Sequence, residues 1–546
     1  MSADVLLLNL TRFGDLLQSQ PLIQDLHDSG HRVGLVCLDN FAAALPLLRH
    51  VDAAWPLPGA KLMAALDRHW QTAAAALLDL ARRIREEARP SRVVNLTPSL
   101  PGRLLAKLLA PSPEAVLGFG LDAEGFGVNR GIWSSFLSGA TLRRQNAPFN
   151  LVDMFRMVGA PLYAPGIAAR PGLFSLQTPP AEALAHADAL LAEPENPPEG
   201  GHIQGFVALQ LGASEARRQW PTAYFAALGD RLWREAGLCP VLLGAPAESP
   251  LAQEYAARAS APFVNAVGRT NIPQLAALLT RTRLLATNDT GTMHLAAGLG
   301  LPCLAFFLAT AQPWDTGPYL SGCCCLEPAL PCHPCPYNQA CPHDQVCLTR
   351  INPRRAGDLI LARLESGDWQ AGLNPELCRE ARVWLTETDE FGFARVRSLS
   401  GHEREDRSLW LNRQRLFWRH ILDDLESTTD GAAARPARAE ARTPDAPPCS
   451  PAFAARVAPV LDQAARLLDM LAEQGRLTGK SSKAGQLFLL NCERLQNLLD
   501  ACPPLASLGY FWRELRQERG GRMDELLRLV DLLAGHLRRW AASMAV

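Results

Sequence analysis

The sequence predicts an α/β protein with two successive doubly wound parallel sheets and a mostly helical C-terminal extension. Short apolar runs alternate with amphipathic segments through residues 5–190, and the alternation begins again after a linker and continues to residue 365. From residue 452 onwards, leucines recur at helical spacing instead. Ligands of doubly wound sheets bind beyond the carboxyl ends of the strands, so we expect functional residues in the loops that follow the strands.

Length and composition restrict the class of protein. The chain has 546 residues, of which 48% are hydrophobic and 20% charged, and its formal net charge is -1. This length exceeds a single hydrophobic core and predicts about three domains, while the balanced charge predicts no nucleic-acid partner. The sequence has neither the pattern of a signal peptide nor an apolar stretch long enough to cross a membrane, so we expect a cytoplasmic protein.

The first α/β half is expected to span residues 1–190. Its apolar runs at residues 5–10, 33–38 and 92–95 are typical of buried parallel strands, and helical spacing of apolar residues separates them. Proline, glutamate and glycine are frequent in residues 190–202, which we interpret as a linker.

The second α/β half is expected to span residues 203–365 and to carry a cysteine-rich loop at residues 323–347. Apolar runs predict strands at residues 206–211, 240–243, 283–287 and 303–307. Beyond this half the pattern changes. We expect a hairpin and an amphipathic helix within residues 375–425, a disordered linker at 427–450 and a helical module at 452–546.

The strongest local signal follows the predicted strand at residues 283–287. The chain reads Asn-Asp-Thr-Gly-Thr-Met-His over residues 288–294 and then enters a helix. A helix N-terminus presents unpaired N–H groups and the positive end of the helix dipole, which suits a diphosphate, and Gly291 lets the backbone approach closely. Asp289 suits sugar or ribose hydroxyls, and His294 suits a phosphate oxygen. The alternative is an ordinary helix start, with Asp or Thr as N-cap and a packed histidine.

A second strand-end segment carries paired basic residues. After the predicted strand at residues 206–211 the chain reads Gly-Ala-Ser, and Arg217 and Arg218 then precede Gln-Trp-Pro and a helix. An arginine beside a helix start can neutralise a diphosphate through its planar fork of donors. The alternative is a solvated pair of charges on the surface.

The first strand-to-helix turn, residues 11–15, reads Thr-Arg-Phe-Gly-Asp. Gly14 permits a tight turn and places Asp15 beside the helix start. A carboxylate at this position can act as a general base towards a hydroxyl across a cleft. The alternative is that Asp15 caps the helix.

Seven of the fourteen cysteines lie between residues 323 and 347. Cys332 and Cys335 have the two-residue gap of a metal knuckle, and Cys341 and Cys347 follow, so four thiolates can complete a tetrahedral site. Their spacing is not that of a standard zinc ribbon, and reduced thiols are the alternative; a redox pair lacks a thioredoxin-like context. The three consecutive cysteines that begin the segment are expected in a strand.

Together, three motifs resemble glycosyltransferase family 9, which contains the ADP-heptose heptosyltransferases. They are Thr-x-x-Gly-Asp after the first strand, Gly-Ala-Ser…Arg-x-Trp-Pro after the linker, and Asp-Thr-Gly-x-x-His-Leu-Ala-Ala near the end of the second half. The resemblance covers residues 4–353, and residues 95–99 and 150–153 stand where relatives have an acceptor-side loop and an Asp-containing helix. It implies a GT-B-like pair of Rossmann-like domains, with the acceptor on the first and the donor on the second.

The resemblance also implies roles for single residues. Asp15 would be the catalytic base that deprotonates the acceptor hydroxyl, and Arg218 stands where relatives usually have a lysine that contacts the diphosphate. The other donor-binding residues that it implies are Gly14, Asp289, Thr290, Gly291, Thr292 and His294. No cofactor is implied for catalysis. The cysteine cluster resembles one that binds iron in part of the family, so a structural iron or zinc is the metal to expect there.

The implied reaction is the inverting transfer of a heptose-type sugar from an ADP-sugar donor to a lipopolysaccharide inner-core acceptor, in a single displacement. The acceptor would then be a lipid-linked oligosaccharide, with peripheral contact at the inner membrane. Basic residues that could meet an acidic lipid are Arg103, Lys107, Arg143 and Arg144. Two alternatives stay open. One is a protein O-heptosyltransferase, favoured by the cysteine cluster and the extra helices, and the other is a non-catalytic scaffold that binds nucleotide-sugars.

Overall fold

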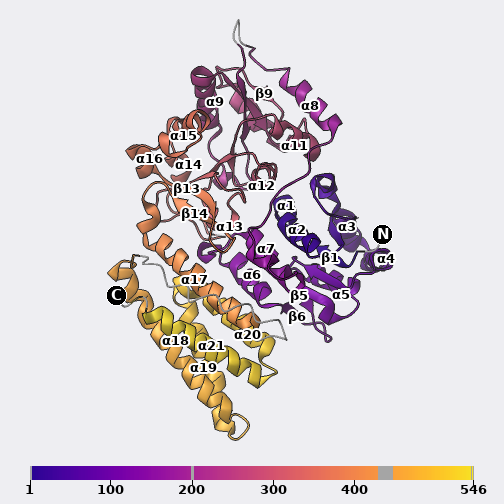
Figure 1. Ribbon diagram of the computed structural model, residues 1–546, viewed down its shortest axis with the longest axis vertical. Helices are drawn as coiled ribbons and strands as arrows, with labels where there is room; N and C mark the ends of the chain where they lie inside the picture. Colours follow the sequence, from indigo (N-terminus) through magenta and orange to yellow (C-terminus); the bar gives the residue numbers. More distant parts are fainter. Residues whose placement is uncertain (1–2, 198–201, 338, 428–446, 543, 545–546) are drawn as a thin grey trace. The chain divides into compact units, whose positions relative to one another are not determined.

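The structure is a computed structural model that describes residues 3–197, 202–337, 339–427, 447–542 and 544. The chain divides into two compact units, which can be followed by colour along the sequence in Figure 1. Unit 1 comprises Met1–Val116 and Phe149–His402, and unit 2 comprises Leu117–Pro148 and Glu403–Val546. The segment between the two parts of unit 1 therefore groups with the C-terminal residues, which the sequence pattern does not indicate.

The first sheet of unit 1 is parallel and has the strand order β3-β2-β1-β4. Its strands are β1 (Val5–Leu8), β2 (Val33–Leu38), β3 (Ala53–Leu57) and β4 (Arg92–Asn95). The helices of this half are α1 (Phe13–Gln18), α2 (Gln20–Asp28), α3 (Gly59–Arg68), α4 (Trp70–Ala88), α5 (Leu100–Leu109) and α7 (Leu151–Gly159). The next helix, α8 (Ala181–Leu191), packs instead against α11 (Ile272–Thr280) of the second half. Because β1 and β4 are neighbours, the loops leading to α1 and α5 leave the same edge of the sheet.

The second sheet has the strand order β14-β13-β12-β11-β10-β7-β8-β9. Its strands are β7 (Gly205–Gln210), β8 (Leu238–Leu243), β9 (Val264–Asn265), β10 (Leu285–Asn288), β11 (Cys303–Phe306), β12 (Cys324–Pro328), β13 (Ala381–Thr388) and β14 (Ala394–Ser398). The helices around it are α9 (Thr222–Ala236), α10 (Ser249–Ala256), α11 (Ile272–Thr280), α12 (Gly291–Gly298), α13 (Pro313–Thr316), α14 (Cys347–Arg350), α15 (Pro353–Ser366) and α16 (Pro375–Glu380). The strand order reverses between the parallel neighbours β7 and β10, which is where doubly wound sheets bind ligands.

The predicted fold class is confirmed, because both sheets are doubly wound and helices follow them. Two of the three consecutive cysteines, Cys324 and Cys325, lie in a strand as predicted, whereas Cys323 precedes it, since β12 begins at Cys324. The predicted hairpin also forms, but it extends the second sheet, because β13 pairs antiparallel with β12 and buries Val383 and Trp384. Residues 198–201 and 428–446, which include most of the second predicted linker, lie outside the described residues.

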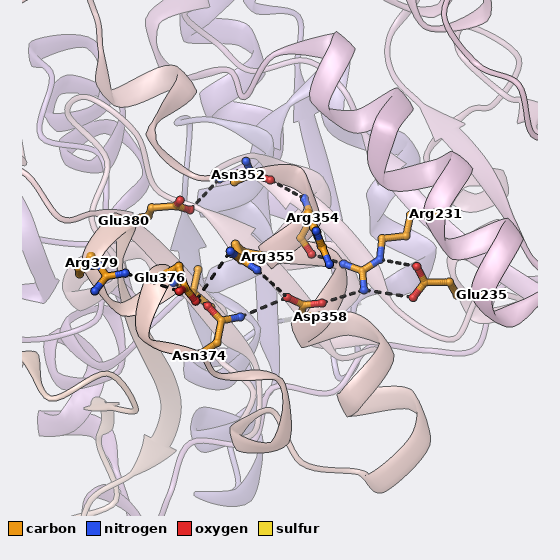
Figure 2. A network of polar contacts seen from close by, with 11 residues as sticks. Arg231, Glu235, Asn352, Arg354, Arg355, Asp358, Asn374, Glu376, Arg379 and Glu380 are labelled. Atoms are coloured by element: carbon orange, nitrogen blue, oxygen red, sulfur yellow. Dashed lines mark hydrogen bonds and ion pairs between the residues drawn. The ribbon is translucent and has the colours of Figure 1, made fainter.

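A polar network fastens α9, α15 and α16 to one another, as Figure 2 shows. Arg231 of α9 donates to both carboxylate oxygens of Glu235, at 2.9 and 3.1 Å, and its Nη2 lies 2.7 Å from Oδ1 of Asp358 on α15. Asn374, which precedes α16, donates to Asp358 at 3.2 Å. Since α9 begins two residues after Trp220, the network braces the helix that follows one of the predicted functional loops.

Unit 2 contains a hairpin and a set of long helices. Its elements are β5 (Val116–Leu121), β6 (Gly127–Arg130), α6 (Ile132–Leu142), α17 (Asp406–Ser427), α18 (Pro451–Leu477), α19 (Ser482–Asp500), α20 (Ala506–Arg519) and α21 (Met523–Ala542). Trp418 of α17 packs between Phe136 of α6 and Phe511 of α20, with ring centroids 4.9 and 5.0 Å away. Among the described residues, no helix of the protein combines the length and the apolar character needed to span a bilayer.

Unit 2 contains a buried carboxylate that makes its stability depend on pH. Glu518 of α20 accepts hydrogen bonds from the backbone N–H of Asn129, at 2.7 Å, and from the hydroxyl of Ser135, at 3.2 Å. Burial raises the pKa of Glu518 from 4.5 to about 7, which exceeds the lowering effect of these bonds. Because the folded form binds the proton more tightly, the stabilisation is fully present below pH 4.5 and is lost as the pH rises through 7.

We therefore expect the Glu518→Gln variant to gain stability relative to the native chain between pH 5 and pH 8, by roughly 3 kcal/mol at most. Urea unfolding of both proteins at the two pH values, followed by the fluorescence of the buried tryptophans, measures this difference. Glu493→Gln, at an exposed position on α19, is the matched control. A difference between Glu518→Gln and native protein that does not change with pH would contradict the prediction.

Candidate functional site

Asn288, the last residue of β10, organises the carboxyl edge of the second sheet. Its side chain is completely buried, and its Oδ1 accepts the backbone N–H of Trp220 at 2.8 Å. Its Nδ2 donates to the carbonyl oxygens of Leu211 and Gly212, at 3.0 and 3.1 Å. One amide thus fixes both ends of the loop after β7 against β10. The motif includes Asn288, but its residue type alone does not reveal this role.

Trp220 anchors the far end of the same loop in the core. Its indole ring stacks on Phe306 of β11 with centroids 4.2 Å apart, and its Nε1 donates to the carbonyl of Ile351 at 3.1 Å. The ring is completely buried. Because the loop is held by Asn288 at both ends and by this ring, the residues between them are presented in a fixed conformation.

Arg218 and Asp289, predicted from two separate motifs, form a buried ion pair. Nη2 of Arg218 contacts Oδ2 of Asp289, and only 5% and 9% of the two residues is exposed. Nη1 of Arg218 also donates to the hydroxyl of Ser214 at 3.3 Å. Nε of Arg218 is buried without a hydrogen-bond partner among the described residues, so the guanidinium retains donor capacity for an anion. The interpretation as a solvated charge is therefore wrong for Arg218, whereas Arg217 is half-buried and pairs with Glu215.

The N-terminus of α12 is not an ordinary capped helix start. Thr290 is the N-cap residue, but in the described structure its side chain makes no capping hydrogen bond and lies 3.3 Å from the hydroxyl of Thr287. Asp289 is turned to Arg218 instead. The first N–H groups of α12 thus keep their capacity for an external acceptor, as expected of an anion-binding helix end.

The N-termini of α1 and α12 face each other across unit 1 at very short range. A Cβ added to Gly14 would lie 2.9 Å from Cδ2 of His294, and a Cβ added to Gly291 would lie 2.6 Å from the ring of Phe13. Both positions therefore require glycine because of space, since neither has a positive φ. The motifs at residues 11–15 and 288–294, which are far apart in the sequence, are brought together by this contact.

Asp15 lies on α1, one residue after the glycine that touches α12. It is partly exposed, and its Oδ2 accepts the backbone N–H of Arg12 at 3.4 Å. Its carbonyl oxygen accepts Nδ2 of Asn9 at 3.1 Å, which fixes the turn after β1. The capping interpretation of Asp15 is thus correct in part. The hydrogen bond from Arg12 is long, so the carboxylate of Asp15 can still accept a proton from another group.

Glu248 is a further candidate residue that the sequence does not single out. Its Oε2 accepts the N–H of Ala245 at 2.7 Å, and its Oε1 lies so close to Gly212 that a Cβ there would overlap with it. Gln210 donates to Glu248 at 3.5 Å and accepts the hydroxyl of Thr292 at 2.9 Å. The hydroxyl of Thr292 is therefore used within the protein. A carboxylate above the ends of β7 and β8 suits a pair of sugar hydroxyls.

The cysteine loop lies against the same edge of the second sheet. The N–H of Cys335 donates to the carbonyl of Ala309 at 2.8 Å, and Arg217 donates to the carbonyl of Gln339 at 3.1 Å. Burial raises the pKa of Cys335, and the other three predicted thiols raise it further, so the four sulfurs share one neighbourhood.

The predicted metal site is not assembled in this loop. Over the described residues, which omit residue 338, no three or more His, Cys, Asp or Glu side chains are placed to hold a metal ion. Structural iron or zinc at Cys332, Cys335, Cys341 and Cys347 therefore stays a prediction.

A buried network joins α7 of the first half to the second half. Asp153, completely buried, accepts the hydroxyl of Tyr319 at 2.7 Å and the N–H of Ala394 at 2.9 Å. Arg156, one turn later, donates to Asp25 of α2 at 2.7 Å. The neighbouring Asn150 donates to the carbonyl of Gly317 at 3.0 Å. Residues 150–153 therefore connect the first half of unit 1 to the second.

Comparison with known proteins agrees with this arrangement. Residues 174–344 match the model of glycosyltransferase family 9 (heptosyltransferase). Lipopolysaccharide heptosyltransferase 1 of Pseudomonas aeruginosa is 29% identical over 170 residues, which are 28% of this chain and 46% of that protein. Lipooligosaccharide heptosyltransferase 2 of Haemophilus influenzae is 29% identical over 103 residues, 18% of this chain and 29% of that protein. The chain thus spans less than half the length of these two relatives.

Among solved structures, ADP-heptose lps heptosyltransferase II of E. coli is similar with a TM-score of 0.46 and 20% identity, over 67% of this chain and 98% of that one. The region that matches the family model contains the buried Arg218–Asp289 pair and the N-terminus of α12. Residues 174–344 are therefore similar to glycosyltransferase family 9 (heptosyltransferase), the family that the motifs of this chain resemble.

Proposed function

We propose that this protein is an inverting glycosyltransferase that moves a heptose-type sugar from an ADP-sugar donor to a lipopolysaccharide inner-core acceptor. The observation that carries the proposal is the cationic, buried Arg218 beside the N-terminus of α12, at the point where the strand order of the second sheet reverses. The names of the two curated relatives, both heptosyltransferases, support the sugar and the acceptor.

The donor diphosphate would lie on the N–H groups of Gly291 and its successors in α12, with Arg218 and His294 at its sides. Arg218 supplies a fixed fork of donors, and the helix end supplies the positive end of its dipole. Asp289 holds the guanidinium in place and presents its second carboxylate oxygen to the donor sugar. Glu248 would receive the ribose hydroxyls. These groups can balance the diphosphate charge without a metal ion at the donor.

Asp15 would act as the general base. In the proposed step it takes the proton of the acceptor hydroxyl while the acceptor oxygen attacks the anomeric carbon. The bond from that carbon to the diphosphate oxygen breaks on the opposite face, so the configuration inverts and ADP leaves. Arg218 and the α12 N–H groups stabilise the negative charge that develops on the departing ADP.

The direct test is transfer of the sugar from ADP-heptose by the full chain to inner-core lipid, followed by mass spectrometry of the lipid and by calorimetry with ADP. We expect ADP to bind and the lipid to gain one heptose residue. A parallel reaction with candidate protein acceptors tests the alternative function, a protein O-heptosyltransferase, which the cysteine cluster and the extra helices favour. A chain that binds neither ADP nor ADP-heptose would refute the proposal.

A further inference from the structure

Large apolar side chains are exposed on α3, the start of α4 and the start of α5. The exposed fractions reach 62% for Trp70, 59% for Met63 and 59% for Leu100, and Leu66 and Leu104 are also exposed. None of the ten residues of α3 is buried. Single exposed apolar residues are common in soluble proteins, but a cluster on consecutive helices is a mark of an interaction surface.

The sequence of α3 makes this exposure a property of one helix face. Met63 and Leu66 are three residues apart on α3, the spacing of one helix face, and Trp70 is the first residue of α4, after the extended residue His69. Leu62, one position before Met63, is the residue of α3 that packs against the core of the first sheet. Met63 and Leu66 therefore point away from the sheet that the helix is attached to.

The helices that carry these residues begin at the edge of the sheet that carries Asp15. α3 follows β3 and α5 follows β4, and the carboxyl ends of parallel strands meet at one edge. Thr97, in the loop that leads to α5, accepts the N–H of Leu10 at 2.9 Å, in the loop that leads to Asp15. α4 packs against both α3 and α5, so the three helices that carry the exposed residues are neighbours (Figure 1).

The charged residues near the exposed apolar residues indicate which kind of partner this surface would bind. Residues 59–78 and 100–109 contain four basic side chains and a single acidic one, Asp67. The basic residues are Lys61, Arg68, Arg103 and Lys107. Exposed Trp, Leu and Met with lysine and arginine around them fit the interface of a bilayer with anionic headgroups, where apolar groups insert and cations meet phosphate.

A second exposed apolar group in the chain lacks this charge pattern. Leu487, Leu489 and Leu490 of α19 are exposed, but residues 482–500 hold two basic and two acidic side chains and no tryptophan. Exposure alone therefore does not make a surface suited to anionic lipid. The α19 residues provide a matched control on the same protein.

We propose that α3, the start of α4 and the start of α5 form a docking surface for an anionic lipid bilayer. Docking by this surface places the edge that carries Asp15 at the membrane, where a lipid-linked acceptor would be presented. This assignment rests on the proposed function and favours a lipid acceptor over a protein acceptor. The surface acts by partial insertion of Met63, Leu66 and Trp70, and by attraction of the four cations to headgroup phosphates.

The test is flotation of the full chain with vesicles of phosphatidylcholine alone, or of phosphatidylcholine with phosphatidylglycerol in equal parts. We expect binding to the anionic vesicles, weaker binding at high salt, and roughly tenfold or greater loss of binding in the triple variant Met63→Ser, Leu66→Ser, Trp70→Ser. The control triple variant Leu487→Ser, Leu489→Ser, Leu490→Ser should bind like the native chain. Both variants replace exposed residues, and circular dichroism checks their folding.

Three results would overturn the docking surface. The first is that the native chain does not bind anionic vesicles. The second is that the Met63, Leu66 and Trp70 variant binds them as well as the native chain does. The third is that the native chain is a dimer and the variant a monomer, which would assign the surface to a second copy. Calorimetry with ADP separates this proposal from the proposed function. Vesicle binding without ADP binding would refute the proposed transferase function but not the docking surface. ADP binding without vesicle binding would refute the docking surface but not the transferase function.

Discussion

Replacing Asp15 with asparagine is expected to lower kcat by about 10²- to 10⁴-fold while the affinity for ADP stays close to native. Asparagine keeps the shape of the side chain and can still accept the N–H of Arg12, so the turn before α1 should persist. It cannot take a proton from the acceptor hydroxyl. The loss should therefore fall on turnover, which single-turnover transfer from ADP-heptose measures separately from binding.

Asp79→Asn on α4, whose carboxylate is largely exposed and pairs with Arg82, serves as the matched control. It removes a carboxylate from the same half of the protein without touching the edge where α1 begins. We expect its kcat to equal that of the native chain. A kcat for Asp15→Asn within about twofold of native would exclude Asp15 as the general base.

Replacing Arg218 with methionine is expected to weaken ADP binding by about 10- to 100-fold and also to destabilise the fold. The second effect arises because Asp289, only 9% exposed, would be left buried without its cation. Breaking a buried ion pair from one side typically lowers stability by about 3–5 kcal/mol. Calorimetry with ADP and urea unfolding measure the two effects.

A double variant separates donor binding from stability. Arg218→Met combined with Asp289→Leu removes both charges, and such replacements of a whole buried pair are often neutral for stability. We expect the double variant to regain most of the lost stability but not the affinity for ADP. Native-like ADP binding by the double variant would show that the pair is purely structural and that the donor lies elsewhere.

The candidate site was predictable in its parts but not in its assembly. The motifs at residues 11–15, 210–224 and 288–294 were each recognisable, because a glycine or a charged residue at a strand end is unusual locally. Whether Asp289 caps its helix or pairs with Arg218 depends on the loop that Asn288 holds 68 to 77 residues away along the chain. Such long-range hydrogen bonds leave no periodic trace in the sequence.

Two features of the site, the positions of Glu248 and Asp153, could not be predicted from the sequence motifs. Glu248 lies beyond β8, and only the absence of a side chain at Gly212 makes space for its carboxylate. Asp153 is completely buried and bonded to Tyr319, 166 residues later. A single Glu or Asp in a helical or loop segment is ordinarily a solvated surface residue, so its burial follows from packing rather than from composition.

The sequence by itself determined the doubly wound halves, the strand-end loops and the helical extension, because apolar periodicity depends on neighbours a few residues apart. Tertiary structure alone decided that residues 117–148 group with the C-terminal helices, that β13 and β14 complete the second sheet, and that Gly14 meets His294. Each of these depends on contacts between segments distant in the chain, where complementarity of shape and charge, and not local pattern, selects the partner.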